Sequence, residues 1–164
     1  MPHNRPLVLI VDNNRDNREM YAEYLHTRGF RVIACSDSEA SVSLARSCVP
    51  DIILMELRMM GMSGLEVIDR MKREPALSHL PVVALTASVL DFEQAAALAA
   101  GFTEVLAKPC FPEDVERAIT RLIAKHPRAA AQSHKPLRAA QRAERRRRVP
   151  TRVQAIRMSV HSPR

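Results

Sequence analysis

Five short aliphatic runs recur between residues 7 and 107, and each is followed by a stretch with the spacing of an amphipathic helix. The runs are Leu7–Val11, Arg31–Cys35, Asp51–Met55, Val82–Thr86 and Glu104–Ala107. They are nearly continuous in apolar character rather than alternating, which predicts strands covered on both faces. Five strand-then-helix units predict a parallel sheet with right-handed crossovers and helices on both sides. We therefore expect an α/β fold of the doubly wound type.

The ends of the helical stretches can also be predicted. Glycine is common just after a helix and proline is common at its first position, so these residues mark boundaries. The five stretches run from about Asp16 to just before Gly29, over Ser38–Ser47, from Leu65 to near Pro75, over Asp91–Ala100, and from Pro112 through Ile123.

Charge divides the chain into two parts. Residues 1–125 carry 14 Lys and Arg against 17 Asp and Glu, whereas residues 126–164 carry 11 Lys and Arg against a single acid. We therefore expect a mildly acidic domain at 5–125 and a basic, disordered tail at 126–164. No apolar run is long enough to cross a bilayer, so no membrane association is expected. The three cysteines match no metal spacing, which favours a reducing cytoplasm.

Polar residues follow four of the five expected strands. Asp12 and Asn13 follow the first, Glu56 ends the third, Thr86 and Ala87 end the fourth, and Lys108 and Pro109 follow the fifth. Taken singly, Asp12 and Thr86 could cap helices or turns, and Lys108 could be a solvated loop charge. Parallel sheets bind ligands at the carboxyl ends of their strands, so we interpret the four positions together as a site.

The segments LVLIVDNNRDNREMYAEYLHTRGF, DIILMELRMMGMSGLE, PVVALTA and EVLAKP carry these residues in order. Together they resemble the receiver domain of two-component response regulators. The resemblance covers residues 5–125 and implies a flavodoxin-like five-stranded parallel sheet, of order 2-1-3-4-5, with five helices. It also implies an aspartate at the end of the third strand that takes a phosphoryl group from a histidine kinase. In such domains Mg²⁺ lies beside that aspartate, a Thr or Ser and a Lys hold the phosphoryl oxygens, and the Lys-Pro bond is usually cis.

The chain departs from that pattern at the reacting position. Glu56 stands where the family has its phosphoacceptor aspartate, and Asn13 replaces the second residue of an acidic pair. Met60 replaces a loop proline, and Val105 replaces an aromatic residue that commonly accompanies switching. The extra methylene of Glu56 moves its carboxylate outward by about 1.5 Å. Phosphoryl transfer needs tighter alignment than that, so we expect no productive attack.

The resemblance also implies a metal site and partners. Asp12, Glu56 and the backbone carbonyl of Arg58 would bind Mg²⁺, and we expect this binding to be weak because Asn13 lacks a charge. We expect a stand-alone, degenerate receiver that is not an enzyme and that acts by binding a histidine kinase or another two-component signalling protein. Three alternatives stay open for Glu56: it imitates the phosphorylated state, it fills the pocket with a salt bridge, or it is itself phosphorylated. The oligomeric state, a homodimer included, is left open.

The tail has two interpretations. It contains no aromatic residue to stack on bases, and its charge is densest at Arg145, Arg146, Arg147 and Arg148. Charge alone predicts contact with nucleic acid or another polyanion, without sequence readout. The alternative is a solubilising extension with no binding role.

Overall fold

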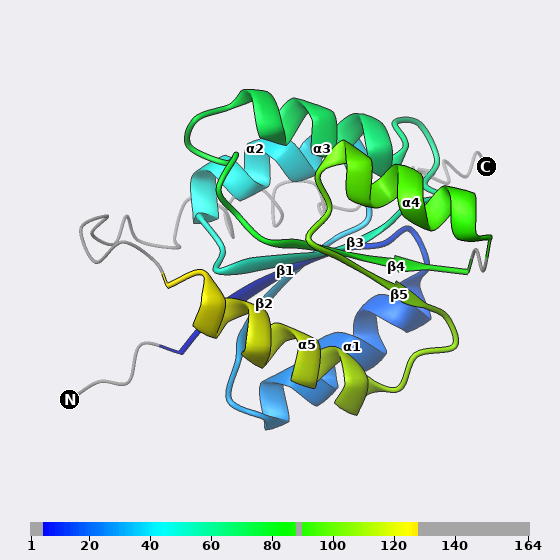
Figure 1. Ribbon diagram of the computed structural model, residues 1–164. Helices are drawn as coiled ribbons and strands as arrows, with labels where there is room; N and C mark the ends of the chain where they lie inside the picture. Colours follow the sequence, from blue (N-terminus) through cyan, green and yellow to red (C-terminus); the bar gives the residue numbers. More distant parts are fainter. Residues whose placement is uncertain (1–4, 88–89, 128–164) are drawn as a thin grey trace, which may run out of the picture.

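The computed structural model describes residues 5–87 and 90–127, so the expectations for the tail beyond Pro127 lie outside the described residues. Strands and helices alternate from the first element to the last (Figure 1). The strands are β1 (Leu7–Val11), β2 (Arg31–Cys35), β3 (Ile52–Glu56), β4 (Val82–Thr86) and β5 (Glu104–Ala107). The helices are α1 (Arg15–Thr27), α2 (Ser38–Cys48), α3 (Gly64–Arg73), α4 (Asp91–Ala100) and α5 (Pro112–Lys125).

Four strands have the predicted bounds, and β3 is displaced by one residue. Asp51 precedes the strand, and its carboxylate Oδ2 accepts a hydrogen bond from the backbone N–H of Leu7 at 2.7 Å. At the other end Glu56 remains within the ladder, opposite Leu85 of β4. The Glu56 side chain therefore projects from the last paired residue of β3 rather than from the loop that follows.

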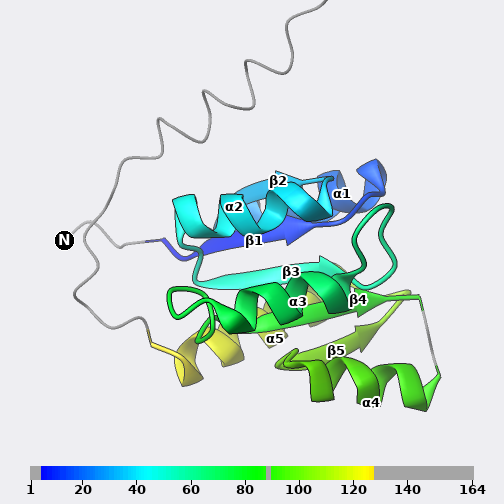
Figure 2. The same cartoon turned by 90° about the horizontal axis from the view of Figure 1, so that it is seen from above.

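All five strands are parallel, in the order β2-β1-β3-β4-β5, as predicted. Helices α1 and α5 cover one face of the sheet, and α2, α3 and α4 cover the other (Figure 1). Seen from above, the strands lie side by side in this order (Figure 2). Because they run in one direction, their carboxyl ends share one edge of the sheet.

Each face of the sheet has its own apolar core. Leu9, Met55 and Ala84 pack towards α2, α3 and α4. Ile10 and Leu54 pack towards α1 and α5. Strands β2 and β5 are only half-buried, yet their side chains pack against both cores: Ile33, Cys35 and Val105 against one, and Val32, Ala34 and Leu106 against the other. Both are edge strands, so one side of each lacks a neighbouring strand.

The loop after β3 returns to the sheet at Gly64. The Ser63 hydroxyl accepts a hydrogen bond from the N–H of Glu66, and the Glu66 carboxylate accepts one from the N–H of Ser63. These two reciprocal bonds form a capping box at the amino end of α3. A Cβ at Gly64 would lie 2.7 Å from the backbone oxygen of Glu56. Glycine therefore lets α3 begin directly against the end of β3.

None of the described helices is long and apolar enough to cross a bilayer.

Candidate functional site

The site begins with strand alternation. Side chains along a strand point alternately to the two faces, so residues two apart share a face. Asp12 follows Val8 and Ile10 in this period, and Glu56 follows Ile52 and Leu54. Those four residues all pack in the core beside α1 and α5. Lys108 lies two residues after Leu106, which packs against that core, so it shares the same face. Alternation thus brings one cation and two carboxylates to the same face at the same edge.

The three side chains meet. The Lys108 ammonium donates hydrogen bonds to Glu56 Oε2 at 2.7 Å and to Asp12 Oδ2 at 2.9 Å. The Asp12 and Glu56 residues are 3% and 7% exposed, so both charges are nearly withdrawn from water. Lys108 starts from β5 and reaches past β4 to the ends of β3 and β1. The sequence placed Lys108 in one site with Glu56 and left a salt bridge between them open, and it did not indicate the bond to Asp12.

Asp12 is also held by the start of α1. Its Oδ1 accepts a hydrogen bond from the backbone N–H of Asn14 at 2.8 Å, and its Oδ2 accepts a second bond from the Asn17 amide at 3.3 Å. The Arg18 guanidinium donates to the backbone carbonyl of Asp12 at 2.6 Å. Asn14 in turn caps α1 by accepting from the N–H of Asn17. These bonds fix the orientation of the Asp12 carboxylate towards Lys108.

Glu56 uses both of its carboxylate oxygens. Oε2 accepts from Lys108, and Oε1 accepts from the backbone N–H of Arg58 at 3.0 Å. The longer side chain therefore curls back to its own loop while it contacts the lysine. Arg58 is exposed, and its guanidinium continues outward to Glu93 of α4.

Burial alone lowers the pKa of the Lys108 ammonium. The hydrogen bonds and the negative charges of Glu56 and Asp12 outweigh that effect, so the pKa is raised above its ordinary value of 10.5. Lys108 is therefore a firmly charged cation at neutral pH. The pocket contains its own counterion for two carboxylates.

The other predicted positions surround this cluster. Asn13 is exposed, and Ala87 and Pro109 are exposed at the ends of the loops. Thr86 is fully buried, and its backbone carbonyl accepts a hydrogen bond from the Lys108 N–H at 2.8 Å. The Lys108-Pro109 peptide bond is cis, as the resemblance implied.

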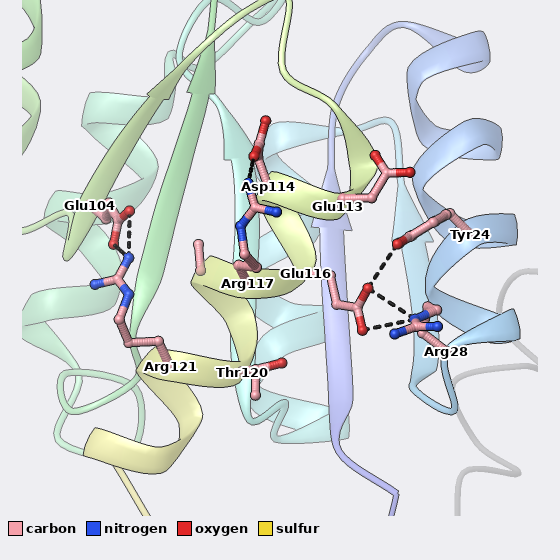
Figure 3. A pocket seen from close by; sticks show the side chains of 10 residues that line it. Tyr24, Arg28, Glu104, Glu113, Asp114, Glu116, Arg117, Thr120 and Arg121 are labelled. Atoms are coloured by element: carbon pink, nitrogen blue, oxygen red, sulfur yellow. Dashed lines mark hydrogen bonds and ion pairs between the residues drawn. The ribbon is translucent and has the colours of Figure 1, made fainter.

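A separate surface hollow runs along α5, and Figure 3 shows its lining. None of Asp12, Glu56, Thr86 or Lys108 lines it. Most of its charges pair among themselves, because Glu116 accepts from Tyr24 and Arg28 and Glu104 accepts from Arg121 (Figure 3). A charged ligand would have to break these pairs, so we place the candidate site at the strand ends and not here.

Comparison with known proteins agrees with this geometry. The family model of the response regulator receiver domain matches residues 8–120. The chain belongs to this receiver family. It is 30% identical over 102 residues to the polar-differentiation response regulator DivK of Brucella anthropi, covering 62% of this chain and 83% of DivK.

Solved receiver structures have the same fold. The chemotaxis response regulator CheY4 of Vibrio cholerae superposes with a TM-score of 0.69 at 24% identity, over 73% of this chain and 99% of CheY4. The receiver domain of the sensor histidine kinase PA1611 from Pseudomonas aeruginosa has a TM-score of 0.69 at 28% identity, over 73% of this chain and 98% of that domain. The PA1611 domain holds a magnesium ion in its active-site cleft.

The carboxylates that could hold Mg²⁺ in this receiver are already engaged with a lysine. Asp12 and Glu56 supply the two carboxylates at the strand ends, and both already bond to the Lys108 ammonium. No group of three or more His, Cys, Asp or Glu residues suited to a metal occurs in residues 5–87 or 90–127. A divalent ion would share these two carboxylates with the lysine or displace it from them. We therefore derive no step through a metal.

Three residues near the site were missed by the sequence interpretation. Asn17 and Arg18 hold Asp12, and Tyr21 donates from its hydroxyl to the backbone carbonyl of Cys110, beside the loop that carries Lys108. The helical spacing of Asn14, Asn17 and Tyr21 on α1 could have indicated the first of these contacts. The contact with Cys110 joins segments 89 residues apart, and no local pattern indicates it.

Proposed function

We propose that this receiver is an atypical module of a two-component phosphorelay that acts by protein–protein interaction. Glu56 occupies the position of the phosphorylated aspartate and provides a permanent negative charge there. The observation that supports the proposal is the pair of bonds that engage both Glu56 oxygens, one to Lys108 and one to the Arg58 N–H. A buried carboxylate whose two oxygens both already accept hydrogen bonds is poorly placed for in-line attack on a phosphodonor.

The proposal includes weak Mg²⁺ binding. Mg²⁺ is a hard cation that binds through carboxylates and waters, and here it competes with an ammonium already in place. Asn13 adds an oxygen without a charge and is exposed. Weak metal binding would leave the phosphoryl oxygens without the cation that stabilises their charge during transfer.

The partner we propose is a histidine kinase or another two-component signalling protein in the cytoplasm. Family membership supports this class of partner, since receiver domains are signalling modules that interact with such proteins. We propose no catalytic role for the chain. Residues 5–125 form the interacting domain in this proposal, and the basic residues 126–164 are an appendage to it.

Intact-mass measurement after incubation with a small-molecule phosphodonor and Mg²⁺ tests the proposal. We expect no added phosphoryl group on the natural chain, because Glu56 is displaced and held by Lys108. The matched variant is Asn13→Asp combined with Glu56→Asp, which restores the family's residues at both positions. That variant should gain one phosphoryl group. A phosphoryl group on the natural chain that is lost in Glu56→Gln would show a working phosphoacceptor and overturn the proposal.

Nucleic-acid binding through the tail is a second candidate. The observation that favours it is the net charge of residues 126–164, which carry 11 Lys and Arg and one acid. Such a segment attracts polyanions by counterion release, whatever the receiver domain does.

A further inference from the structure

Acidic and basic residues lie at opposite ends of the helices. Each of the five helices has at least one acid in its first turn, and α1, α2, α3 and α5 each have a base in the last turn. None of the five last turns contains an acid. Each helix begins where a strand ends and runs back along the sheet, so the first turns lie at the edge with the pocket and the last turns at the opposite edge (Figure 1). We call these the carboxyl edge and the amino edge, and the amino edge is the basic one.

The acids of the amino edge already have partners inside the domain. Glu74, just after α3, and Glu104, at the start of β5, each form an ion pair with an arginine of a helix. Asp51, just before β3, accepts a hydrogen bond from the backbone N–H of Leu7. These acids are therefore engaged within the domain.

Three cations of the amino edge have no such engagement. Arg5 precedes β1, Arg31 begins β2 and Lys125 ends α5. Arg5 and Lys125 are exposed, and Arg31 is half-buried. Within residues 5–87 and 90–127, their side chains make no hydrogen bond or ion pair. Their charges are therefore available to a ligand outside the domain.

The three cations are spread along the edge. The backbone N–H of Arg31 donates to the carbonyl of Pro6 at 2.8 Å, which places Arg31 beside the segment that carries Arg5. The end of α5 lies at the same edge in a different layer, below the start of the sheet (Figures 1 and 2). The chain continues from Lys125 directly into the basic residues 126–164. The most basic part of the sequence is thus attached at the basic edge of the domain.

We propose that the amino edge is the surface of the receiver that contacts a nucleic-acid duplex held by residues 126–164. This inference rests on the second candidate function above, because residues 1–125 carry 14 Lys and Arg against 17 Asp and Glu and would not hold a polyanion alone. Once residues 126–164 hold the duplex, the amino edge is kept close to it, so that even weak contacts form at a high effective concentration.

A duplex suits this surface better than a compact anion. It presents one phosphate charge per about 1.7 Å of its axis, so a rigid row of phosphates can meet cations that are spread along an edge. The partial negative charge at the carboxyl end of a helix offsets part of the charge of Lys125. Arg5 and Arg31 lie at strands, where no helix dipole opposes them, and they should make the stronger contacts.

The carboxyl edge determines the orientation. Asp12 and Glu56 lie there with a single lysine between them, and the acids of the first helical turns surround them. These charges repel phosphates, so the pocket faces away from the duplex. A signalling partner at the pocket and a duplex at the amino edge would therefore not compete for the same surface.

Fluorescence anisotropy of the full chain with labelled duplex DNA tests the proposal. The test variant is Arg5→Gln combined with Lys125→Gln, which removes two exposed cations of the amino edge. The matched control is Arg15→Gln combined with Arg117→Gln, whose side chains are 78% and 74% exposed and belong to the first half of α1 and of α5. Both variants lower the net charge by the same amount, so only the position of the lost charge differs.

The salt dependence gives the readout. Each lost phosphate contact should reduce the fall in affinity between about 50 and 200 mM salt by about 3.5-fold. The test variant should therefore show a fall about three- to tenfold smaller than that of the natural chain, and the control should differ from the natural chain by less than about twofold. Equal effects of the two variants would show that net charge alone matters and would overturn the proposal.

Backbone amide shifts in NMR spectra locate the surface without any mutation. Addition of the duplex should shift the amides of Arg31 and His126 at the amino edge more than those of Asn14 and Ser38 at the carboxyl edge. Shifts confined to residues beyond Pro127, or largest at the carboxyl edge, would overturn the proposal. Displacement of the duplex by poly-glutamate at equal charge concentration would assign the surface to an acidic protein instead.

The outcomes for the tail and for the edge can be separated. If the natural chain binds the duplex but the test variant behaves like the control, residues 126–164 bind it without the amino edge, and only this inference fails. If the natural chain does not bind the duplex at all, the second candidate function fails and this inference falls with it.

Discussion

At the scale of single residues, the pocket is a balance between burial and charge pairing. Removing Asp12, Glu56 and Lys108 from water opposes folding, and only close pairing offsets that cost. One ammonium pairs with two carboxylates here, so the cluster retains one net negative charge. The backbone and amide donors of Asn14, Asn17 and Arg58 stabilise the remainder.

The second bond of Lys108 makes the consequences of mutation unequal. Lys108→Ala leaves two buried carboxylates without their cation, and we expect it to lower the free energy of unfolding by about 2–4 kcal/mol. Glu56→Ala leaves Lys108 paired with Asp12, and it should cost about 1–2 kcal/mol. Urea denaturation of both single variants and the double variant measures these values.

The double variant should cost less than the sum of the single ones, because each single change already removes the shared Glu56–Lys108 bond. Strict additivity would mean that the two charges do not interact. Glu19→Ala, which removes an exposed ion pair with Arg15, is a control that should change stability by less than about 0.5 kcal/mol.

The raised pKa of Lys108 also predicts a pH dependence. A lysine whose pKa is higher in the folded state stabilises the fold fully below its unfolded value of 10.5, and this contribution is lost as pH rises through the folded-state pKa. The difference in unfolding free energy between the natural chain and Lys108→Met should therefore be constant from pH 8 to 10 and shrink above pH 10.5. Urea titrations at several pH values measure it. A difference that grows with pH would contradict the assignment.

At the scale of elements, the junction of β3 and α3 determines where Glu56 lies. Gly64 is the first residue of α3, and its N–H donates to the carbonyl of Leu57 at 2.9 Å. An added Cβ would meet the Glu56 oxygen at 2.7 Å and the Leu57 Cα at 2.9 Å. Both contacts are with backbone atoms, which cannot rotate away as a side chain can.

Gly64→Ala should therefore push α3 away from the end of β3. We expect a loss of about 1–3 kcal/mol in the free energy of unfolding, the range for overpacking a tight contact. Leu65→Ala, one residue further and 38% exposed, is the matched control and should cost less. Thermal and urea denaturation compare them. If Gly64→Ala were as stable as the natural chain, the junction would have space for a methyl group, and the proposed overpacking would be wrong.

Periodicity predicted most elements because it depends on local spacing. Four of five strands have the predicted bounds, as does helix α4, and at the exception, β3, the residue before the strand contacts Leu7, 44 residues away. In the site, motif positions predicted that Glu56 and Lys108 are neighbours. The bond from Lys108 to Asp12 and the bond from Arg58 to Glu93 join different elements, and only the packed sheet and helices bring them together.

At the scale of the whole molecule, the charge is divided between two parts of the chain. Residues 1–125 have a net charge of −3 and residues 126–164 have one of +10, from the Lys and Arg against Asp and Glu that each contains. The net negative charge of residues 1–125 opposes binding of a polyanion to them. Any such binding should therefore depend on the basic residues 126–164. This division separates the two candidate functions and allows each to be tested without the other.

The last prediction concerns these basic residues. Eleven positive charges within 39 residues should give binding to duplex DNA or RNA that is indifferent to sequence and weakens steeply as salt rises, because each phosphate contact releases a counterion. Fluorescence anisotropy with two labelled duplexes of different sequence, at about 50 and 200 mM salt, measures both properties. Truncation after Pro127 should abolish the binding, and replacing Arg145, Arg146, Arg147 and Arg148 by Gln should reduce the salt dependence by up to about four contacts. Binding that survives truncation, or that does not respond to salt, would place the contact on the receiver domain and assign the basic residues no role in it.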